Sequence, residues 1–297
     1  MIATRSIQRH AAPAARAAPS HPAPHLTHLA SHRFDIQHHL LETPSVAALE
    51  PELRHSHAGY VHSIETAATL DGPGIRFVAF LSGCHMRCLY CHNPDTWKLK
   101  HGLHVTVDDL MEEIARYADF LIAYGGGVTL SGGEVMVQDR FVTTLARRIK
   151  EIGVHLALDT NGYLGHHVGP QLMADVDLWL LDLKAFDATL HQRVTGQGNA
   201  PVLDFARRLS GEGRPTWIRF VLVPGLTDDA DDIERLADFV AELQSVERVE
   251  ILPFHQMGAF KWRELGLDYK LTQTQPPDAA LIDQVQHQFA ARGLRVY

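Results

Sequence analysis

The chain has 297 residues, of which 45% are hydrophobic, and a formal net charge of −8. Residues 59–297 carry 22 Lys and Arg against 31 Asp and Glu, a net charge of −9, which argues against a nucleic-acid-binding surface. No apolar run reaches the roughly 20 residues of a membrane span, so we expect neither nucleic acid nor membrane as a partner.

The first 58 residues differ in composition from the rest. The first 34 contain nine Ala, four Pro, five His, four Arg and no acidic residue, and ten of the 20 His lie between His10 and His62. Such a segment offers little periodic apolar surface, which predicts a disordered Ala/Pro/His-rich extension over residues 1–58. Two alternatives are an organellar transit peptide and a metal-binding tract, but the prolines interrupt an amphipathic helix and the histidines lack a regular spacing.

From residue 59 to 297, strand and helix signals alternate as in one α/β domain. Apolar, β-rich runs occupy 77–81, 128–130, 154–158, 178–183, 217–223 and 249–252, and helical patterns occupy 110–122, 138–151, 200–210, 228–243 and 278–292. Thr106 and Asp109 form a capping signal before the first of these helices. Six strands, mostly followed by helices, predict a parallel sheet with right-handed crossovers.

Polar or turn residues come at the end of every predicted strand. In chain order these are the cysteine loop, Ser131-Gly-Gly-Glu134, Asp159-Thr-Asn-Gly162, Asp182-Leu-Lys184, Pro224-Gly225 and Pro253-Phe-His255. The βα loops build the active sites of barrel enzymes, whereas an open doubly wound sheet gathers its ligand contacts at one switch point. The even distribution therefore predicts a curved, partial (β/α)6 barrel. A dinucleotide fingerprint is absent, because no G-x-G-x-x-G follows the first strand.

All three cysteines lie in one loop, Cys84-His-Met-Arg-Cys88-Leu-Tyr-Cys91. Three clustered cysteines, with none elsewhere in the chain, are hard to explain as hydrophobic core residues. An odd number of cysteines in a chain with no secretory segment does not suit a disulfide framework. The spacing predicts a metal centre. A closed zinc site takes four ligands and would need His85 or His92. An iron–sulfur cluster held by three cysteines leaves one iron open for chemistry, and we expect the cluster rather than zinc.

The residue types at five other positions suggest a functional role. Asp182 and Lys184 alternate on one strand and share a face, where a buried charged pair favours a polar cavity. Gly132 and Gly133 either let the backbone approach a ligand closely or form a turn. Arg219 either holds a ligand carboxylate or makes a structural ion pair.

Together these motifs resemble a known family. The cysteine loop, with Tyr90 before its last cysteine, looks like the radical S-adenosylmethionine (SAM) motif, and Ser131-Gly-Gly-Glu134 is similar to the GGE motif of that superfamily. Residues 59–297 resemble the activating enzymes of glycyl radical enzymes, above all those of pyruvate formate-lyase. The matching stretches are Asp71-Gly-Pro-Gly-Ile-Arg-Phe77, Arg87-Cys-Leu-Tyr-Cys-His-Asn93, Gly125-Gly-Gly-Val-Thr129, Leu158-Asp-Thr-Asn-Gly162, Leu181-Asp-Leu-Lys184, Trp217-Ile-Arg219 and Tyr269-Lys-Leu271.

The resemblance implies an oxidoreductase that reductively cleaves SAM at a [4Fe-4S] cluster and takes a hydrogen atom from a glycine of its partner. It assigns Cys84, Cys88, Cys91 and Lys184 to catalysis, with the three cysteines as cluster ligands. The residues that it assigns to cofactor binding are Tyr90, Cys91, His92, Gly132, Gly133, Glu134, Asp182, Leu183, Lys184, Arg219 and His255. It also assigns Asp159, Thr160 and Asp182 to a monovalent cation, and Asp71 to the partner's glycyl loop. Leu180 stands where the family has a methionine, a change that a main-chain carbonyl ligand would survive.

The resemblance also narrows the partner. No cysteine lies outside the loop, which excludes the ferredoxin-like insert of several related activases, and the ribonucleotide reductase activases are shorter. We therefore expect pyruvate formate-lyase as the partner, in anaerobic glucose metabolism, and a flavodoxin- or ferredoxin-type electron donor. The chain is expected to be a cytoplasmic monomer, or organellar if residues 1–58 are a transit peptide. Two alternatives stay open: an activase of another glycyl radical lyase, and a non-enzymatic zinc-binding interaction module.

Overall fold

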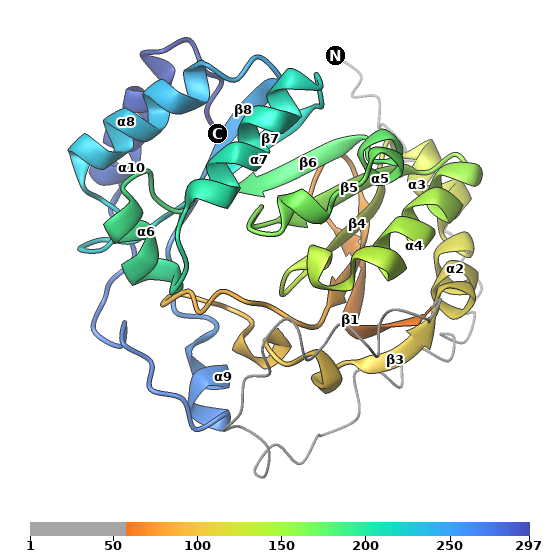
Figure 1. Ribbon diagram of the computed structural model, residues 1–297. Coiled ribbons are helices and arrows are strands. Elements are labelled where there is room, and N and C mark those ends of the chain that lie inside the picture. Colours follow the sequence, from red (N-terminus) through yellow and green to blue (C-terminus); the bar gives the residue numbers. More distant parts are fainter. Residues whose placement is uncertain (1–57) are drawn as a thin grey trace, which may run out of the picture.

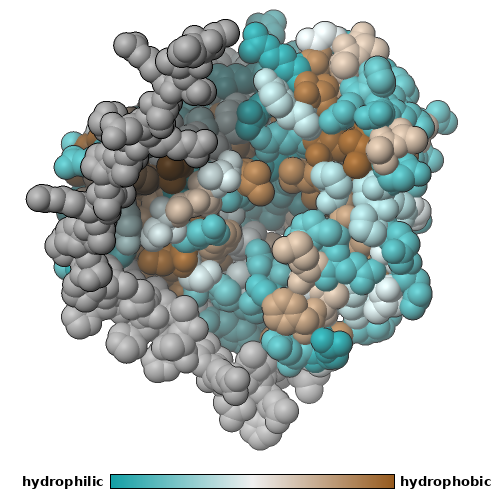
Figure 2. All heavy atoms as spheres, turned by 180° about the vertical axis from the view of Figure 1, so that it is seen from behind, coloured by the Kyte–Doolittle hydropathy of each residue, from teal (hydrophilic) through white to brown (hydrophobic). Residues whose placement is uncertain are grey.

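The computed structural model describes residues 58–297. The extension predicted for residues 1–58 therefore lies, apart from Ala58, outside the described residues. Within the described part, no helix is long and apolar enough to cross a membrane. Figure 2 shows one face of the molecule, where hydrophilic residues predominate and apolar ones are scattered.

A single eight-stranded sheet forms the centre of the molecule, in the order β3-β1-β2-β4-β5-β6-β7-β8. Six of its strands are parallel: β2 (Arg76–Leu81), β4 (Gly127–Gly132), β5 (His155–Thr160), β6 (Leu178–Asp182), β7 (Thr216–Leu222) and β8 (Val246–Pro253). Each coincides with one of the predicted apolar runs, because strands covered on both faces read as nearly continuous hydrophobic sequence. The α/β class and the partial (β/α)6 barrel are thereby confirmed, with β3 and β8 as the terminal strands of the sheet. Residues 295–297 pair along the outer edge of β8.

Helices connect the parallel strands, and two more follow β8, the last strand (Figure 1). They are α2 (Val107–Ala115), α3 (Ala118–Ala123), α4 (Asp139–Glu151), α5 (Pro170–Asp175), α6 (Ala188–Thr195), α7 (Ala200–Gly211), α8 (Ala230–Ala241), α9 (Ala259–Glu264) and α10 (Ala279–Ala290). Single 3₁₀ turns lie at Pro94–Thr96, Leu99–His101, Val135–Gln138 and Gly165–His167. The capping signal before α2 is confirmed, since Thr106 Oγ accepts from the Asp109 N–H and the Asp109 carboxylate accepts from the Thr106 N–H.

The predicted helix over 110–122 is wrong as one continuous helix. It divides into α2 and α3, because the N–H groups of Arg116 and Tyr117 turn to the carbonyls three residues back, those of Glu113 and Ile114. Short helices α5, α6 and α9 were not predicted, since six to eight residues leave too little periodic pattern.

Two antiparallel strands extend the sheet beyond the predicted six. Strand β1 (Ala58–Ala68) pairs with β2, and β3 (Leu103–Thr106) pairs with β1. Buried and partly exposed residues are interspersed along β1, so it lacks the continuous apolar run that marks the central strands. Strand β1 thus pairs with β2, the first parallel strand, on its outer side. Residues 69–75 connect β1 to β2, and we call them the β1–β2 loop.

Candidate active site

The cysteine loop follows β2 and is held by main-chain hydrogen bonds to distant segments. The N–H groups of Gly83 and Cys84 donate to the carbonyls of Thr96 and Trp97 at 2.6 and 3.1 Å, and those of Arg87 and Leu89 donate to Thr195 and Val194 at 2.7 and 2.9 Å. The Arg87 guanidinium also donates to the main-chain oxygens of Cys84 and Met86. The loop is therefore fixed without using the side chain of any cysteine.

The three thiols are free and partly buried. Burial raises the pKa of Cys91 to about 12, with the negative charge of Cys88 adding to the effect, and raises the pKa of Cys84 and Cys88 as well. Thiols in this setting ionise when a cation offsets burial, which is the requirement of a metal-binding site.

The donor arrangement fits a cluster better than a single ion. Among residues 58–297, no three His, Cys, Asp or Glu side chains converge as the ligands of one metal ion would. The His92 ring stacks on His255 at a centroid distance of 4.1 Å, and its Nε2 lies 3.1 Å from the His255 carbonyl oxygen. His92 is thus engaged with His255, which leaves the three cysteines as the ligand set, the number that holds a cluster with one open iron.

Segment 132–134 packs directly on the cysteine loop. Gly132 has φ +116°, and a Cβ there would lie 2.3 Å from the Leu81 oxygen. A Cβ on Gly133 would lie 2.3 Å from the Gly83 oxygen. The N–H groups of Gly133 and Glu134 donate to those same oxygens at 2.9 and 2.8 Å. The pairing of β4 with β2 therefore already requires Gly132, and contact with the cysteine loop requires Gly133. Their approach to a ligand stays a prediction.

The Glu134 side chain turns inward and joins this loop to the end of β5. Its carboxylate accepts from the Thr160 hydroxyl and the Asn161 N–H, both at 2.8 Å, and from the Met136 N–H at 3.0 Å. Burial raises the pKa of Glu134 to about 7. Glu134 was predicted to bind the cofactor, and here its side chain organises the neighbouring loops.

Asn161 belongs to this site, although we had not assigned it a role from the sequence. Its side-chain amide lies 3.9 Å from the Cys84 sulfur, and its Oδ1 accepts from the Tyr163 N–H. Hydrogen bonds to cluster sulfurs tune the reduction potential. The sequence signal was present, because Asn161 lies in the Asp-Thr-Asn-Gly stretch at the end of a strand.

Asp182 and Lys184 lie on one face, as predicted. The Lys184 Nζ is 2.9 Å from Asp182 Oδ2, and it lies 5.6 Å from the centroid of the Tyr90 ring. Burial acts to lower the pKa of Lys184, but Asp182 and other acidic neighbours hold it well above its usual value. Leu183, on the other face, is buried in the core, and its N–H donates to the Arg219 carbonyl. A positive charge is thus held next to the cysteine loop.

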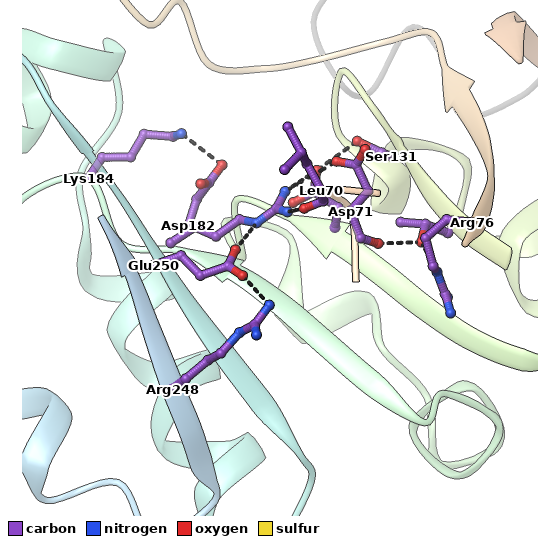
Figure 3. Close-up of polar contacts among 11 residues, drawn as sticks. Leu70, Asp71, Arg76, Ser131, Asp182, Lys184, Arg248 and Glu250 are labelled. Carbon is purple, nitrogen blue, oxygen red and sulfur yellow. Dashed lines mark hydrogen bonds and ion pairs between the residues drawn. The ribbon is translucent and has the colours of Figure 1, made fainter. Parts of the chain in front are cut away.

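Arg219 lies at the centre of a cluster of carboxylates, of which Asp71 and Glu250 are labelled in Figure 3. Its Nε donates to Glu250 at 3.0 Å, and its Nη1 lies 3.5 Å from both Asp71 and Asp159. Asp159 also accepts from the Ser131 hydroxyl at 2.7 Å, and burial raises the pKa of Asp159 to about 6. Of the two interpretations of Arg219, the structure shows the ion pair.

Asp71 reaches this cluster from the β1–β2 loop. Its main-chain oxygen accepts from the Thr129 hydroxyl at 2.6 Å, so the loop is tied to β4 as well.

Glu250 was missed by the sequence analysis. Its signal is a charged residue within the buried run 249–252, comparable to Arg219 within 217–223.

The three residues assigned to a cation are only partly brought together. Asp159 and Asp182 lie on neighbouring strands, and the charge of Asp182 acts to raise the pKa of Asp159. Thr160 Oγ1, however, donates to Glu134 and accepts from the Gly162 N–H at 3.0 Å. Each of these two carboxylates already faces a cationic side chain, Arg219 or Lys184, and the Thr160 hydroxyl is engaged elsewhere.

The loop after β8 closes over the cysteine loop. Besides the stacking of His255 on His92, the Trp262 indole N–H donates to the Cys91 oxygen at 2.8 Å. A Cβ on Gly258 would lie 2.6 Å from the His92 Cα. The prediction that the first and last βα loops share one site agrees with these contacts.

Comparisons with known proteins agree with this geometry. The family model of the radical SAM superfamily matches residues 78–240. The chain is 45% identical over 230 residues, 77% of its length and 94% of the relative, to pyruvate formate-lyase 1-activating enzyme of Escherichia coli (strain K12). It is 46% identical over 227 residues, 74% of its length and 90% of the relative, to pyruvate formate-lyase-activating enzyme of Staphylococcus aureus (strain USA300). A crystal structure of a domain of pyruvate-formate lyase-activating enzyme from Bacteroides vulgatus superposes with a TM-score of 0.50 and 28% identity, covering 58% of this chain and 98% of that one.

Proposed function

The chain belongs to the radical SAM superfamily and, within it, to the pyruvate formate-lyase-activating enzymes, and we propose that it installs a glycyl radical in a pyruvate formate-lyase. When bound, a [4Fe-4S] cluster supplies the electron that cleaves SAM, and the resulting 5′-deoxyadenosyl radical removes a hydrogen atom from a glycine of the partner. The observation that supports this most is a main-chain-fixed loop with three free thiols beside a buried Lys184.

Each part of the site has a role in this proposal. Cys84, Cys88 and Cys91 ligate the cluster. Of the other residues assigned to the cofactor, those that form its walls are Tyr90, His92, Gly132, Gly133, Glu134, Asp182, Lys184 and His255. Leu183 instead lies in the core, and Arg219 is engaged in ion pairs. Lys184 presents a cation to the carboxylate of SAM, as charge-assisted bonds to carboxylates require. Glu134 acts through the loops that it joins, since its carboxylate is already occupied.

The test is the formation of the glycyl radical itself. Reduced, reconstituted protein with SAM and pyruvate formate-lyase should produce a doublet in the electron paramagnetic resonance spectrum, together with 5′-deoxyadenosine. Cofactor cleavage without a radical on this partner would leave the chemistry standing and reject the substrate, in favour of another glycyl radical lyase. A colourless protein with one zinc ion, after anaerobic incubation with iron and sulfide, would support the zinc-binding module.

A monovalent cation between Asp159 and Asp182 is part of the proposal. It would offset the repulsion between two carboxylates on neighbouring strands. Raising KCl at constant ionic strength, with a bulky organic cation as replacement, should increase SAM affinity in the wild type but not in Asp159→Asn. Equal responses of the two proteins would remove the cation from the site.

The remaining assignments concern the protein's surroundings. We propose a flavodoxin- or ferredoxin-type electron donor, a monomeric state and a cytoplasmic location. We also propose that residues 59–297 form the radical SAM domain and that residues 1–58 are dispensable for chemistry. A chain starting at Ala58 should match the full chain in SAM cleavage, and a loss of turnover with folding preserved would show that the extension takes part.

A further inference from the structure

Arg219 holds the β1–β2 loop as well as the carboxylates around it. One terminal N–H donates to the main-chain oxygen of Leu70, and the other terminal nitrogen faces Asp71 at 3.5 Å. In the sheet, β4, β5 and β6 separate β2 from β7, so this contact spans the interior of the curved sheet. Arg219 is therefore the point at which β7 holds the loop that carries Leu70 and Asp71.

Glu250 fixes the guanidinium from the opposite side. Its Oε2 accepts from Arg219 Nε at 3.0 Å, and its Oε1 contacts Arg248 at 2.5 Å. Arg248 in turn lies 3.2 Å from the centroid of the Trp217 ring and 4.9 Å from that of Tyr297. Both oxygens of Glu250 are thus in use, and the residue is buried.

Other carboxylates compete with Asp71 for the Arg219 guanidinium. Asp159 is as close to Nη1 as Asp71 is, and Asp182 adds to the negative potential around the guanidinium. Both Nη1 contacts, at 3.5 Å, are longer than a good charge-assisted hydrogen bond. Without Glu250 on Nε, the guanidinium is free to turn toward Asp159 and to release Leu70.

We propose that Glu250 is a positioning residue, which orients Arg219 so that it holds Leu70 and Asp71 in place. This rests on the proposed function and on the assignment of Asp71 to the partner's glycyl loop, which the family resemblance implies. Leu70 is 81% exposed, so the segment that Arg219 holds by its main chain lies at the surface. Glu250 acts on the transfer to the partner through this segment, without touching either reactant.

The first test needs no cofactor. In the cluster-free protein, an endoproteinase that cleaves before aspartate should cut the Leu70–Asp71 bond about tenfold faster in Glu250→Gln than in the wild type, because the charged hydrogen bond that orients Arg219 is weakened. Glu250→Asp keeps the charge and should recover part of the protection. Asp175→Asn is the matched control. Asp175, at the end of α5, is also a buried carboxylate, and it pairs with Arg147 of α4 at 3.3 Å.

The second test compares two activities of the loaded enzyme. Glu250→Gln should lower glycyl radical formation about tenfold, and change uncoupled SAM cleavage by less than about twofold. Arg248→Gln removes the contact of Arg248 with Glu250 Oε1 and should lower glycyl radical formation in the same way, by a smaller factor. It replaces Glu250→Gln as the test variant if Glu250→Gln does not fold. Cleavage of the Leu70–Asp71 bond at the wild-type rate in these variants, or equal losses in both activities, would overturn the proposal. A wild-type enzyme that makes no glycyl radical would reject the proposed function and leave the proteolysis result standing.

Discussion

The cysteine loop and the Arg219 cluster are held in place by opposite means. Main-chain hydrogen bonds fix the cysteine loop, and its three thiols have no ion-pair or disulfide partner. Side-chain contacts fix the Arg219 cluster, where Asp71, Asp159 and Glu250 all face one guanidinium. The first region offers unused ligands on a rigid support, whereas the second has its charges already paired.

This difference separates how the two regions respond to a ligand. A cluster can bind at the cysteine loop without breaking any of the bonds that position it. Any ligand of Arg219 must displace an existing partner, and the 3.5 Å contacts to Asp71 and Asp159 are the weaker ones. We expect the cysteine loop to be preformed and the Arg219 cluster to exchange partners.

The largest expected effect is at the cysteine loop. Cys88→Ala should abolish iron binding and SAM cleavage, because two thiolates do not hold the cluster. Iron content and 5′-deoxyadenosine formed under dithionite measure this. Since main-chain bonds hold the loop, the circular dichroism and unfolding of the cluster-free variant should remain those of the wild type. Formation of 5′-deoxyadenosine by Cys88→Ala would refute the ligand assignment.

His92→Ala is the matched control on the same loop. Its ring stacks on His255 and is not placed with the thiols as a ligand of one ion. The variant should therefore keep the cluster and show a weaker affinity for SAM. Loss of iron in His92→Ala would revive the histidine-ligand interpretation.

The next effect is on stability and concerns the Arg219 cluster. Arg219→Met leaves three carboxylates without their shared cation, which should lower the free energy of unfolding of the cluster-free protein by about 3–5 kcal/mol. Arg207→Met on α7 removes a partner of Asp204 in an exposed pair and should cost less than about 1 kcal/mol. Urea denaturation of both variants measures the contrast. Similar losses would show that Arg219 does not hold its cluster together.

The same contrast explains what the sequence could predict. The cysteine loop was predictable because its three ligands lie within eight positions, and the central strands because burial on both faces leaves a continuous apolar run. The loops at the C-terminal ends of the strands were predictable as one site, since parallel strands bring those ends to one edge.

The Arg219 cluster was not predictable in the same way. Glu250 lies 31 positions from Arg219 and Leu70 lies 149 positions away, and no local pattern records which charges meet. Strand β1 was missed because it lacks a continuous apolar run. Close packing of Gly132 on β2 and of Gly133 on the cysteine loop could not be read from the sequence, and the assignment of both glycines to a ligand stays a prediction.

A smaller effect is expected from pH, through a carboxyl that joins the two regions. Burial raises the pKa of Glu134 to about 7, against an ordinary value of 4.5. Between these values the folded chain binds more protons than the unfolded chain, so the free energy of unfolding falls as pH rises. Relative to Glu134→Gln, the cluster-free wild type should lose at most about 3 kcal/mol from pH 4.5 to 7. Glu151→Gln, an exposed position on α4, is the control. A difference between wild type and Glu134→Gln that does not vary with pH would contradict the assignment.

The smallest effect, and the most informative for function, is expected at Asp71. Asp71→Ala removes one of the two weak contacts of Arg219 and leaves the cysteine loop untouched, so SAM cleavage should continue. Glycyl radical formation should fall about tenfold, because the side chain assigned to the partner is lost while the cofactor site stays intact. The measurement is the ratio of glycyl radical to 5′-deoxyadenosine in one reaction mixture, which cancels differences in cluster content. A fall in both products by the same factor would place Asp71 with the cofactor, and the Arg219 cluster would then act as one unit with the cysteine loop.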